Sequence, residues 1–228
     1  MNQQTTRLNK YLALSLGLSR READDLIASG DVEVNNTVAI LGAAVSDNDK
    51  ISVKGELLGA KPAYRYVAFH KPVGYVCSRK SQGENLTIYE ILPSDMANLK
   101  PVGRLDKDSS GIILLTNDGD FAHQMTHPSF HKVKIYEVTL DHALEPLHQQ
   151  MISDYGVEIG DGTSKLGLEK QDDTRQKWSI TMSEGRNRQI RRTFSALGYE
   201  VTALHRTAFG NFKLGDLQPG DIMPISIS

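Results

Sequence analysis

The sequence predicts an α+β protein, in which a compact N-terminal module of two helices and short strands precedes a larger domain on a mostly antiparallel mixed sheet. Three observations lead to this class. Near the N-terminus, apolar residues recur at helical spacing. From residue 65 onward, runs of β-branched and aromatic residues follow one another. Helical patterns interrupt those runs only at intervals, which argues against a regular alternation of strand and helix.

Two helices open the chain. The first is predicted from Leu8 to Leu16, where apolar residues repeat at helical spacing, and Gly17 ends it. The second begins after Ser19, because Ser19 and Glu22 have the Ser-x-x-Glu spacing of a capping box. Its buried face is formed by Ala23, Leu26 and Ile27.

A short strand and a linker follow the helices. Residues 32–34 alternate apolar and charged side chains up to two asparagines at 35–36, as in a strand that enters a tight turn. Residues 59–64, GAKPAY, have the composition of a linker, and β-rich sequence follows them. We therefore expect one domain over residues 6–58 and a second over residues 64–228.

The second domain contains the predicted sheet. Its strand candidates are RYVAFHKP, GYVCS, GIILLT, KIYEVTL, KWSITMS and YEVTALHR. Helices are predicted at about 118–125, 143–153 and 187–197. In the last of these, Ile190, Phe194 and Leu197 mark the buried stripe, and Gly198 ends the helix.

Composition excludes several classes of protein. With 39% apolar and 24% charged residues, the chain is typical of soluble globular proteins. No apolar run approaches the ~20 residues of a membrane span, and residues 1–10 lack the apolar stretch of a signal peptide, so we expect a cytoplasmic protein. The single cysteine, Cys77, excludes an intramolecular disulfide, and the seven histidines lack the spacing of metal ligands. We therefore expect no metal site.

Basic residues cluster in two places although the net charge is only −2. Such clusters can bind phosphate despite a near-neutral total, because salt screens each charge beyond about 10 Å. The alternative is two solvated helix faces. Arg20 and Arg21 stand at the start of the second helix, whose free backbone N–H groups also suit a phosphate. The clusters consist of Arg7, Lys10, Arg20 and Arg21, and of Arg186, Arg188, Arg191 and Arg192.

Residues 103–119, GRLDKDSSGIILLTNDG, place two aspartates directly before a buried strand. The DKDSSG segment matches the start of an EF-hand calcium loop, but Asn117 stands where that loop needs a bidentate glutamate, and a strand follows instead of a helix. A plain turn is the second interpretation. The third is a catalytic carboxylate at Asp106, favoured by Arg104 two residues earlier and by the rigid strand behind the loop.

Several segments together resemble a known family. GRLDKDSSGIILLTNDG, HKPVGYVCS, KIYEVTL, EGRNRQIRR and EVTALHRTAFGNFKLGDLQPGD are similar to the pseudouridine synthases of the RsuA, RluB and RluF type. RLNKYL, SRREADDLI and GDVEVNN, within residues 6–53, resemble the S4 RNA-binding domain. The resemblance covers essentially the whole chain. It implies an S4-like domain followed by a pseudouridine synthase domain, and an enzyme that acts on ribosomal RNA.

Pseudouridine formation detaches uracil from its ribose, turns it and rejoins it through carbon, which requires a carboxylate and a flipped-out nucleotide but no cofactor. The resemblance assigns the carboxylate to Asp106, as nucleophile or base, and its ion-pair partner to Arg191. It assigns Tyr136 to stacking on the target base and Leu204 to packing beneath the pocket. Arg104 is expected to fill the gap left by the flipped nucleotide or to bind its phosphate. The other clustered basic residues are expected to contact RNA.

Three functions are weighed from the sequence. The first is a monomeric rRNA pseudouridine synthase that recognises a structured stem-loop, free or in a pre-ribosomal particle. The overall sequence of the aspartate loop slightly favours 23S rRNA over 16S rRNA as its substrate. The second is a non-catalytic RNA-binding assembly factor that keeps the fold, which the joint presence of Asp106, Arg191 and Tyr136 disfavours. The third is a glycosidase using Asp106 and Asp108, which would have to face each other across a substrate.

Overall fold

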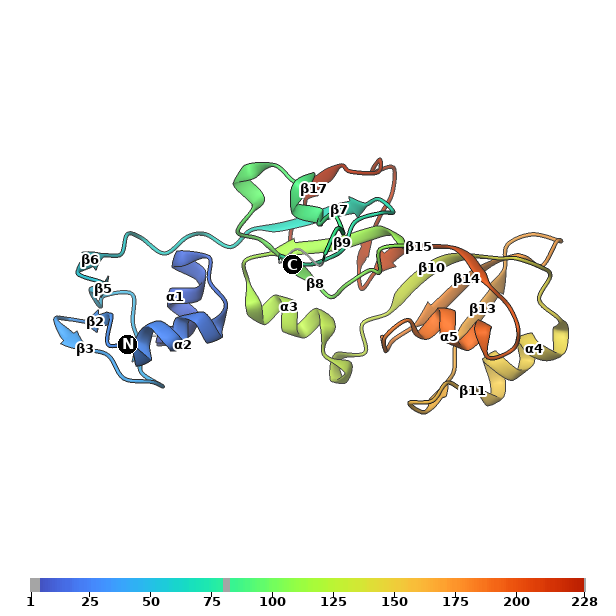
Figure 1. The fold of residues 1–228 in the computed structure, drawn as a ribbon, viewed down its shortest axis with the longest axis horizontal. Coiled ribbons are helices and arrows are strands. Elements are labelled where there is room, and N and C mark those ends of the chain that lie inside the picture. Colours follow the sequence, from blue (N-terminus) through green and yellow to red (C-terminus); the bar gives the residue numbers. More distant parts are fainter. Residues whose placement is uncertain (1–4, 80–82, 228) are drawn as a thin grey trace. The chain divides into compact units, whose positions relative to one another are not determined.

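The computed structural model describes residues 5–79 and 83–227, and the chain separates into two compact units, Met1–Arg65 and Tyr66–Ser228 (Figure 1). Within the described residues, no helix has both the length and the apolar character needed to cross a membrane.

The N-terminal unit consists of two helices and two small sheets. Its core is formed by side chains from both helices and from the strands beneath them, among them Leu8, Leu12, Ala23 and Ile51. One sheet has the strand order β3-β2-β5-β6, and β1 pairs with β4 in the other. The elements are β1 (Thr6–Arg7), α1 (Leu8–Leu16), α2 (Arg20–Ala28), β2 (Val32–Val34), β3 (Thr37–Val38), β4 (Ala44–Val45), β5 (Ile51–Val53) and β6 (Glu56–Leu57).

Local sequence signals account for the boundaries of these elements. Gly17 adopts a left-handed conformation, with φ of 71°, and ends α1 as predicted. The Ser19–Glu22 capping box is confirmed, since the Ser19 hydroxyl accepts from the Glu22 amide and the Glu22 carboxylate accepts from the Ser19 amide. Asn35 and Asn36 both have positive φ, at 53° and 64°, which is the conformation of the tight turn predicted there.

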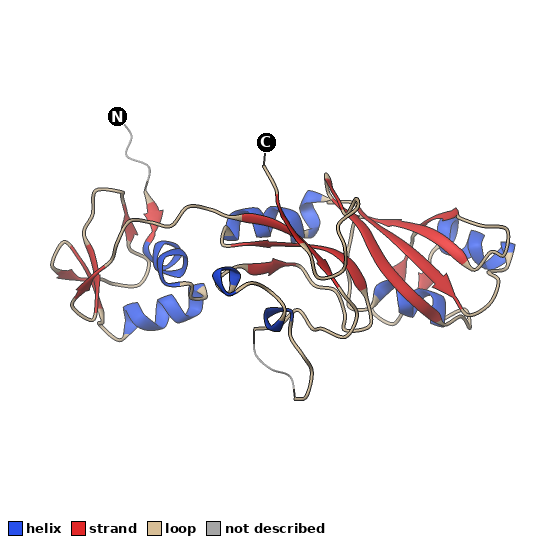
Figure 2. Ribbon diagram, turned by 90° about the horizontal axis from the view of Figure 1, so that it is seen from above, coloured by secondary structure: helices blue, strands red, loops and turns tan. Residues whose placement is uncertain are grey.

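The second unit is an α+β domain, as predicted, around a mixed sheet with the strand order β13-β14-β10-β15-β9-β7-β17 (Figure 2). Its first half comprises β7 (Tyr66–Lys71), β8 (Lys100–Val102), β9 (Ser110–Thr116), α3 (Gly119–Thr126), β10 (Lys134–Leu140), α4 (Pro146–Gln150), β11 (Val157–Glu158) and β12 (Thr163–Ser164). Its second half comprises β13 (Gly167–Lys170), β14 (Lys177–Met182), α5 (Gln189–Ser195), β15 (Val201–Phe209), β16 (Phe212–Lys213) and β17 (Ile222–Pro224).

The centre of the sheet is buried on both faces. Ile113 and Leu115 of β9 pack into one apolar cluster, and Ile112 and Leu114 pack into another on the opposite face. This explains why β9 reads as a continuous apolar run. β15 and β9 run parallel, whereas the other pairs of strands described in this sheet are antiparallel. The remaining core lies where α5 packs on β10, β14 and β15, around Trp178.

Two predicted elements differ from the structure. The GYVCS segment forms no strand; instead it makes an isolated bridge between Val76 and Thr87. The helix predicted at 143–153 is the short α4 followed by a π-helical turn at Met151–Tyr155. It begins only at Pro146, because proline lacks the amide proton that an interior helical position needs and is favoured in the first turn.

Candidate active site

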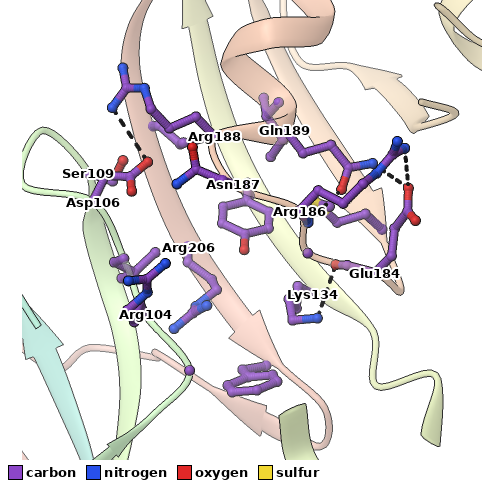
Figure 3. Close-up of a pocket in the computed structure, with 18 of the residues that line it drawn as sticks. Arg104, Asp106, Ser109, Lys134, Glu184, Arg186, Asn187, Arg188, Gln189 and Arg206 are labelled. Atoms are coloured by element: carbon purple, nitrogen blue, oxygen red, sulfur yellow. Dashed lines mark hydrogen bonds and ion pairs between the residues drawn. The ribbon is translucent and has the colours of Figure 1, made fainter. Parts of the chain in front are cut away.

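A cavity of about 290 Å³ lies in the second unit where the loop before β9 faces β10, β15 and the segment before α5 (Figure 3). Four of the predicted site residues line it: Arg104, Asp106, Tyr136 and Leu204. Arg186 and Arg188 line it as well, whereas Arg191 and Arg192 do not. The fold therefore brings together residues from four separate parts of the chain.

Asp106 lies in the loop between β8 and β9, and its side chain is 34% exposed. Backbone hydrogen bonds hold this loop: the Gly74 amide donates to the Lys107 carbonyl at 2.8 Å, and the Ser109 amide donates to the Asp106 carbonyl at 3.1 Å. The segment around residue 74, which was expected to be a strand, thus serves to position the aspartate loop.

The buried side chain of Lys71 and the partly buried side chain of Cys77 hold the same loop. The Lys71 ammonium donates to the Ser109 carbonyl at 2.7 Å, and burial lowers its pKa to about 8. The Cys77 thiol donates to the Leu105 carbonyl at 3.4 Å and accepts from the Leu105 amide at 3.5 Å. Burial raises the pKa of the Cys77 thiol, so the group remains a neutral hydrogen-bonding partner.

Gly111 allows the aspartate loop to approach the strand that faces it. It pairs with Arg206 of β15 in the parallel register, and its φ is +110°. A Cβ at this position would overlap the backbone of Arg206. Glycine is therefore required both by the backbone conformation and by the close contact between β9 and β15.

Tyr136 and Leu204 present their side chains from neighbouring strands. Tyr136 of β10 is 8% exposed and pairs across the sheet with Arg206 and Ile180. Leu204 of β15 is also buried and lines the same pocket. A ring held this firmly can offer one face to a base.

The ion pair around Asp106 differs from the prediction. The Nη1 atom of Arg188 lies 3.5 Å from Oδ2 of Asp106, and the predicted partner, Arg191, instead lies with its Nε 3.3 Å from Oδ2 of Asp108. Arg191 also donates to the backbone carbonyls of Asp108, at 2.9 Å, and Val201, at 2.6 Å. The guanidinium of Arg191 is thus held by Asp108 and Val201, and Arg188, which has a left-handed conformation with φ of 47° directly before α5, lies beside Asp106 instead.

Asp108 joins the two arginines, a role that the turn interpretation of this residue missed. Its carboxylate accepts two hydrogen bonds from Arg188, both at 3.2 Å, and forms the ion pair with Arg191. Burial alone would raise the pKa of Asp108, but the hydrogen bonds from Arg188 and the charge of Arg191 hold it below its ordinary value. Arg188 is thus shared between Asp106 and Asp108.

The other arginines near α5 are already engaged by carboxylates. Arg186 pairs with Glu184 at 3.0 Å and with Asp161 at 3.4 Å, and Arg192 pairs with Asp161 at 2.8 Å. These contacts tie the loop between β11 and β12 to the rim of the pocket. In the N-terminal unit, Arg7 donates to the Gly42 carbonyl, and Lys10, Arg20 and Arg21 lie on or beside its helices.

Two cations in the pocket wall, Lys134 and Arg206, were not predicted. A signal for both was present in the sequence. Lys134 stands two residues before Tyr136, and Arg206 two residues after Leu204, so strand alternation places each on the same face as a predicted site residue.

Comparison with known proteins gives a consistent result. Residues 65–196 match the model of the RNA pseudouridylate synthase family, and residues 6–51 match the S4 domain. The chain is 39% identical to ribosomal small subunit pseudouridine synthase A of Pasteurella multocida, with 96% of each chain covered. It is 34% identical to ribosomal large subunit pseudouridine synthase B of Bacillus subtilis, with 94% of this chain and 90% of the relative covered. A crystal structure of a pseudouridylate synthase matches with a TM-score of 0.68 and 34% identity, over 96% of both chains.

Proposed function

The chain belongs to the RNA pseudouridylate synthase family, and from this premise we propose that it converts a uridine of ribosomal RNA to pseudouridine with Asp106 as the essential carboxylate. The observation that carries the proposal is the convergence of Asp106, Tyr136, Arg104 and Leu204 on one pocket. A pocket of this kind suits a single flipped-out nucleotide, since the base cannot react while it is stacked in a helix.

We propose the following roles, which the geometry of the pocket supports. Asp106 acts as nucleophile or base on the flipped nucleotide, and Arg188 compensates its charge from 3.5 Å. Tyr136 stacks on the uracil ring, and Leu204 supports the base from below. Arg191 acts indirectly, because its contacts with Asp108 and Val201 hold the loop and the start of β15 together.

Ribosomal RNA is the substrate class that the names of the relatives support. Those names include the small subunit, the large subunit and a dual-specificity RNA pseudouridine synthase, RluF of Salmonella typhi, at 37% identity over 97% of this chain. We keep 23S rRNA as the first substrate to test and 16S rRNA as the second. The enzyme would act as a monomer, on free RNA or in a pre-ribosomal particle.

The N-terminal unit is proposed to bind the RNA. Its match to the S4 domain supports this role, and so does the exposure of Arg20 and Arg21 beside the start of α2. Residues 6–58 would then supply affinity for a structured RNA, and residues 64–228 would supply the chemistry.

The test is to incubate the wild type and Asp106→Asn with unmodified 23S and 16S rRNA and to map pseudouridine by carbodiimide adducts. We expect one or a few modified uridines with the wild type and none with the variant. A wild-type protein that binds either RNA but modifies no uridine would instead support a non-catalytic assembly factor. Equal modification by both proteins would remove Asp106 from the catalytic role.

A further inference from the structure

Arg206 is a buried cation in the wall of the pocket. The residue is 2% exposed, and it pairs with Tyr136 on one side and Gly111 on the other. Its Nε donates to the Ile112 carbonyl at 2.8 Å, whereas its Nη2 has no hydrogen-bond partner. Across residues 5–79 and 83–227, no carboxylate forms an ion pair with this guanidinium. A buried cation of this kind normally has one.

Lys134 is a second cation in the same wall. Its ammonium lies 5.5 Å from the centre of the Phe209 ring, and the Arg206 guanidinium lies 4.9 Å from that ring. Lys134 donates to the backbone carbonyl of Glu184 at 3.1 Å. Burial, and next the charge of Arg206, lower the pKa of the Lys134 ammonium. The two like charges are therefore close enough to repel each other.

The pocket thus has two electrostatically different parts. Figure 3 shows Asp106 beside Arg188 in one part of the site, and Arg206 and Lys134 in another, away from the Asp106 carboxylate. The first pair is a compensated carboxylate. The second pair carries positive charge and an unused donor on Arg206. Within the described residues Arg206 has no carboxylate partner, and the Glu184 carboxylate that acts on Lys134 is paired with Arg186. This arrangement suits an electron-rich group brought in by the substrate.

The part of the RNA that can reach Arg206 is the base. A flipped nucleotide enters a pocket with its base first, because its phosphates remain joined to the strand outside. Arg206 is almost closed off from solvent, and its guanidinium carbon lies 5.9 Å from the centre of the Tyr136 ring. A base that stacks on Tyr136 would therefore lie beside this guanidinium.

We propose that Arg206, assisted by Lys134, donates to a carbonyl oxygen of the target uracil and stabilises the negative charge that this oxygen acquires during the reaction. The inference rests on the proposed function and assigns two further residues to it. Neither residue transfers a proton or forms a bond to carbon; they act as fixed donors aimed at a developing charge.

For each possible role of Asp106, the reaction places negative charge on a carbonyl oxygen of uracil. If Asp106 attacks C1′, or removes a proton from C2′, the C1′–N1 bond breaks and its electron pair stays on uracil, shared by N1, O2 and O4. If Asp106 adds to C6 of the ring, the electrons of the C5–C6 double bond move onto O4. In that route the C1′–N1 bond then breaks as well, and the bond between Asp106 and C6 breaks at the end. In the other two routes Asp106 leaves C1′, or returns the proton to C2′, as C1′ bonds to C5. In every case C5 finally loses its proton and N1 gains one. No oxidant or reductant takes part.

The experiment is a double-mutant cycle between a residue and an oxygen atom. Stem-loop RNAs that contain the mapped target would carry uridine, 4-thiouridine or 2-thiouridine at the reacting position. Single-turnover rates at saturating enzyme would be measured for the wild type, Arg206→Gln and Lys134→Gln. Lys177→Gln, an exposed lysine on β14 outside the pocket, is the control. RNA affinity and its salt dependence would be measured in parallel, and thermal unfolding would verify the fold.

With uridine, Arg206→Gln should lower the rate by about 10²–10³-fold and leave the RNA dissociation constant within about threefold. Lys134→Gln should cost about tenfold, and Lys177→Gln nothing measurable. One of the two thio-substituted RNAs has sulfur in place of the oxygen that Arg206 contacts. Because sulfur is a weak acceptor, the interaction is already lost in this RNA. The rate loss caused by Arg206→Gln should therefore be at least about tenfold smaller with this RNA than with uridine. If Arg206→Gln does not fold, the same cycle with Lys134→Gln tests whether the two cations contact a uracil oxygen.

Four results would overturn the inference. Losses that are equal on all three RNAs would show that the donors do not contact either oxygen. A weaker affinity with a reduced salt slope and an unchanged rate would assign the cations to a phosphate. A folded Arg206→Gln or Lys134→Gln as fast as the wild type would remove that residue from the chemistry. A wild-type protein that forms no pseudouridine in any RNA overturns the proposed function, and this inference with it.

Discussion

Asp108 and Asp106 have the same side chain and lie two residues apart, yet their surroundings separate their roles. Asp106 faces the pocket with one arginine at 3.5 Å, whereas Asp108 binds two arginines and faces the start of α5. Asp108 therefore controls how much of Arg188 remains available to Asp106. Sequence alternation alone could not distinguish the two aspartates, because the difference depends on α5, which lies eighty residues further along the chain.

Asp108→Asn should lower the single-turnover rate by about tenfold, since it weakens the charged hydrogen bonds that fix Arg188 and Arg191. RNA affinity should change little. The matched control is Asp161→Asn, which removes a carboxylate from Arg186 and Arg192 but not from Arg188. Rates measured with saturating enzyme would test this, and equal losses in both variants would contradict a specific role for Asp108.

Lys71 gives a prediction about pH and stability. The folded chain releases the Lys71 proton near pH 8, and an unperturbed lysine does so near 10.5. Between these values the unfolded state binds more protons, so this group makes the free energy of unfolding rise with pH. Relative to that of Lys71→Met, the free energy of unfolding of the wild type should rise by on the order of 2–3 kcal/mol across this pH range.

Denaturant unfolding of both proteins at a series of pH values from 8 to 10.5 would measure the gain. A wild-type stability that stays constant or falls relative to Lys71→Met would mean that the lysine keeps its proton in the folded chain.

Among the elements, the contact between β9 and β15 is the one on which the site depends most. Gly111→Ala should destabilise the domain by at least about 3 kcal/mol, because the new methyl group overlaps the Arg206 backbone and φ is +110°. Gly220→Ala is the matched control, since its φ is +91° but no atom lies within 4 Å of the added carbon. It should cost only about 1–2 kcal/mol of conformational strain.

Denaturant unfolding monitored at Trp178, which is fully buried in this domain, would compare the two variants. Similar losses for Gly111→Ala and Gly220→Ala would show that the close approach of the two strands contributes little.

Elements set by local chemistry could be predicted, and those set by distant contacts could not. The Ser19–Glu22 box, the Gly17 stop and the run of β9 depend on neighbouring residues, and all three agree with the structure. Val76 and its neighbours read as a strand, but their backbone groups bond to Leu86 and Ile88 instead of a sheet partner. A local sequence pattern does not show which partner the backbone groups of a segment will bond to.

The same distinction holds for the site. Asp106, Tyr136 and Leu204 were named from motifs, and the structure places them on one pocket. Arg188 instead of Arg191 lies beside Asp106, and Arg188 has a positive φ, which is uncommon for a non-glycine residue and which no spacing rule predicts. Lys134 and Arg206 could have been found by strand alternation, but the unused donor of Arg206 became visible only with the packing.

For the whole molecule, the proposed division of labour predicts how a truncated chain behaves. Without residues 1–58, the remaining chain should fold, since its core lies within residues 66–228. Its affinity for rRNA should fall, and the slope of log affinity against log salt should become shallower, because basic residues that meet phosphates have been removed. Filter binding over a range of KCl concentrations would test this. Unchanged affinity and slope would place RNA binding outside the N-terminal unit.

The central claim is that Asp106 performs chemistry on a uridine. Joining C1′ to C5 expels the hydrogen at C5, so tritium release from [5-³H]uridine-labelled rRNA measures the reaction itself. We predict that the wild type releases tritium in proportion to the pseudouridine formed, and that Asp106→Asn binds the same RNA with unchanged affinity but releases none. Tritium release by Asp106→Asn at the wild-type rate would contradict the account.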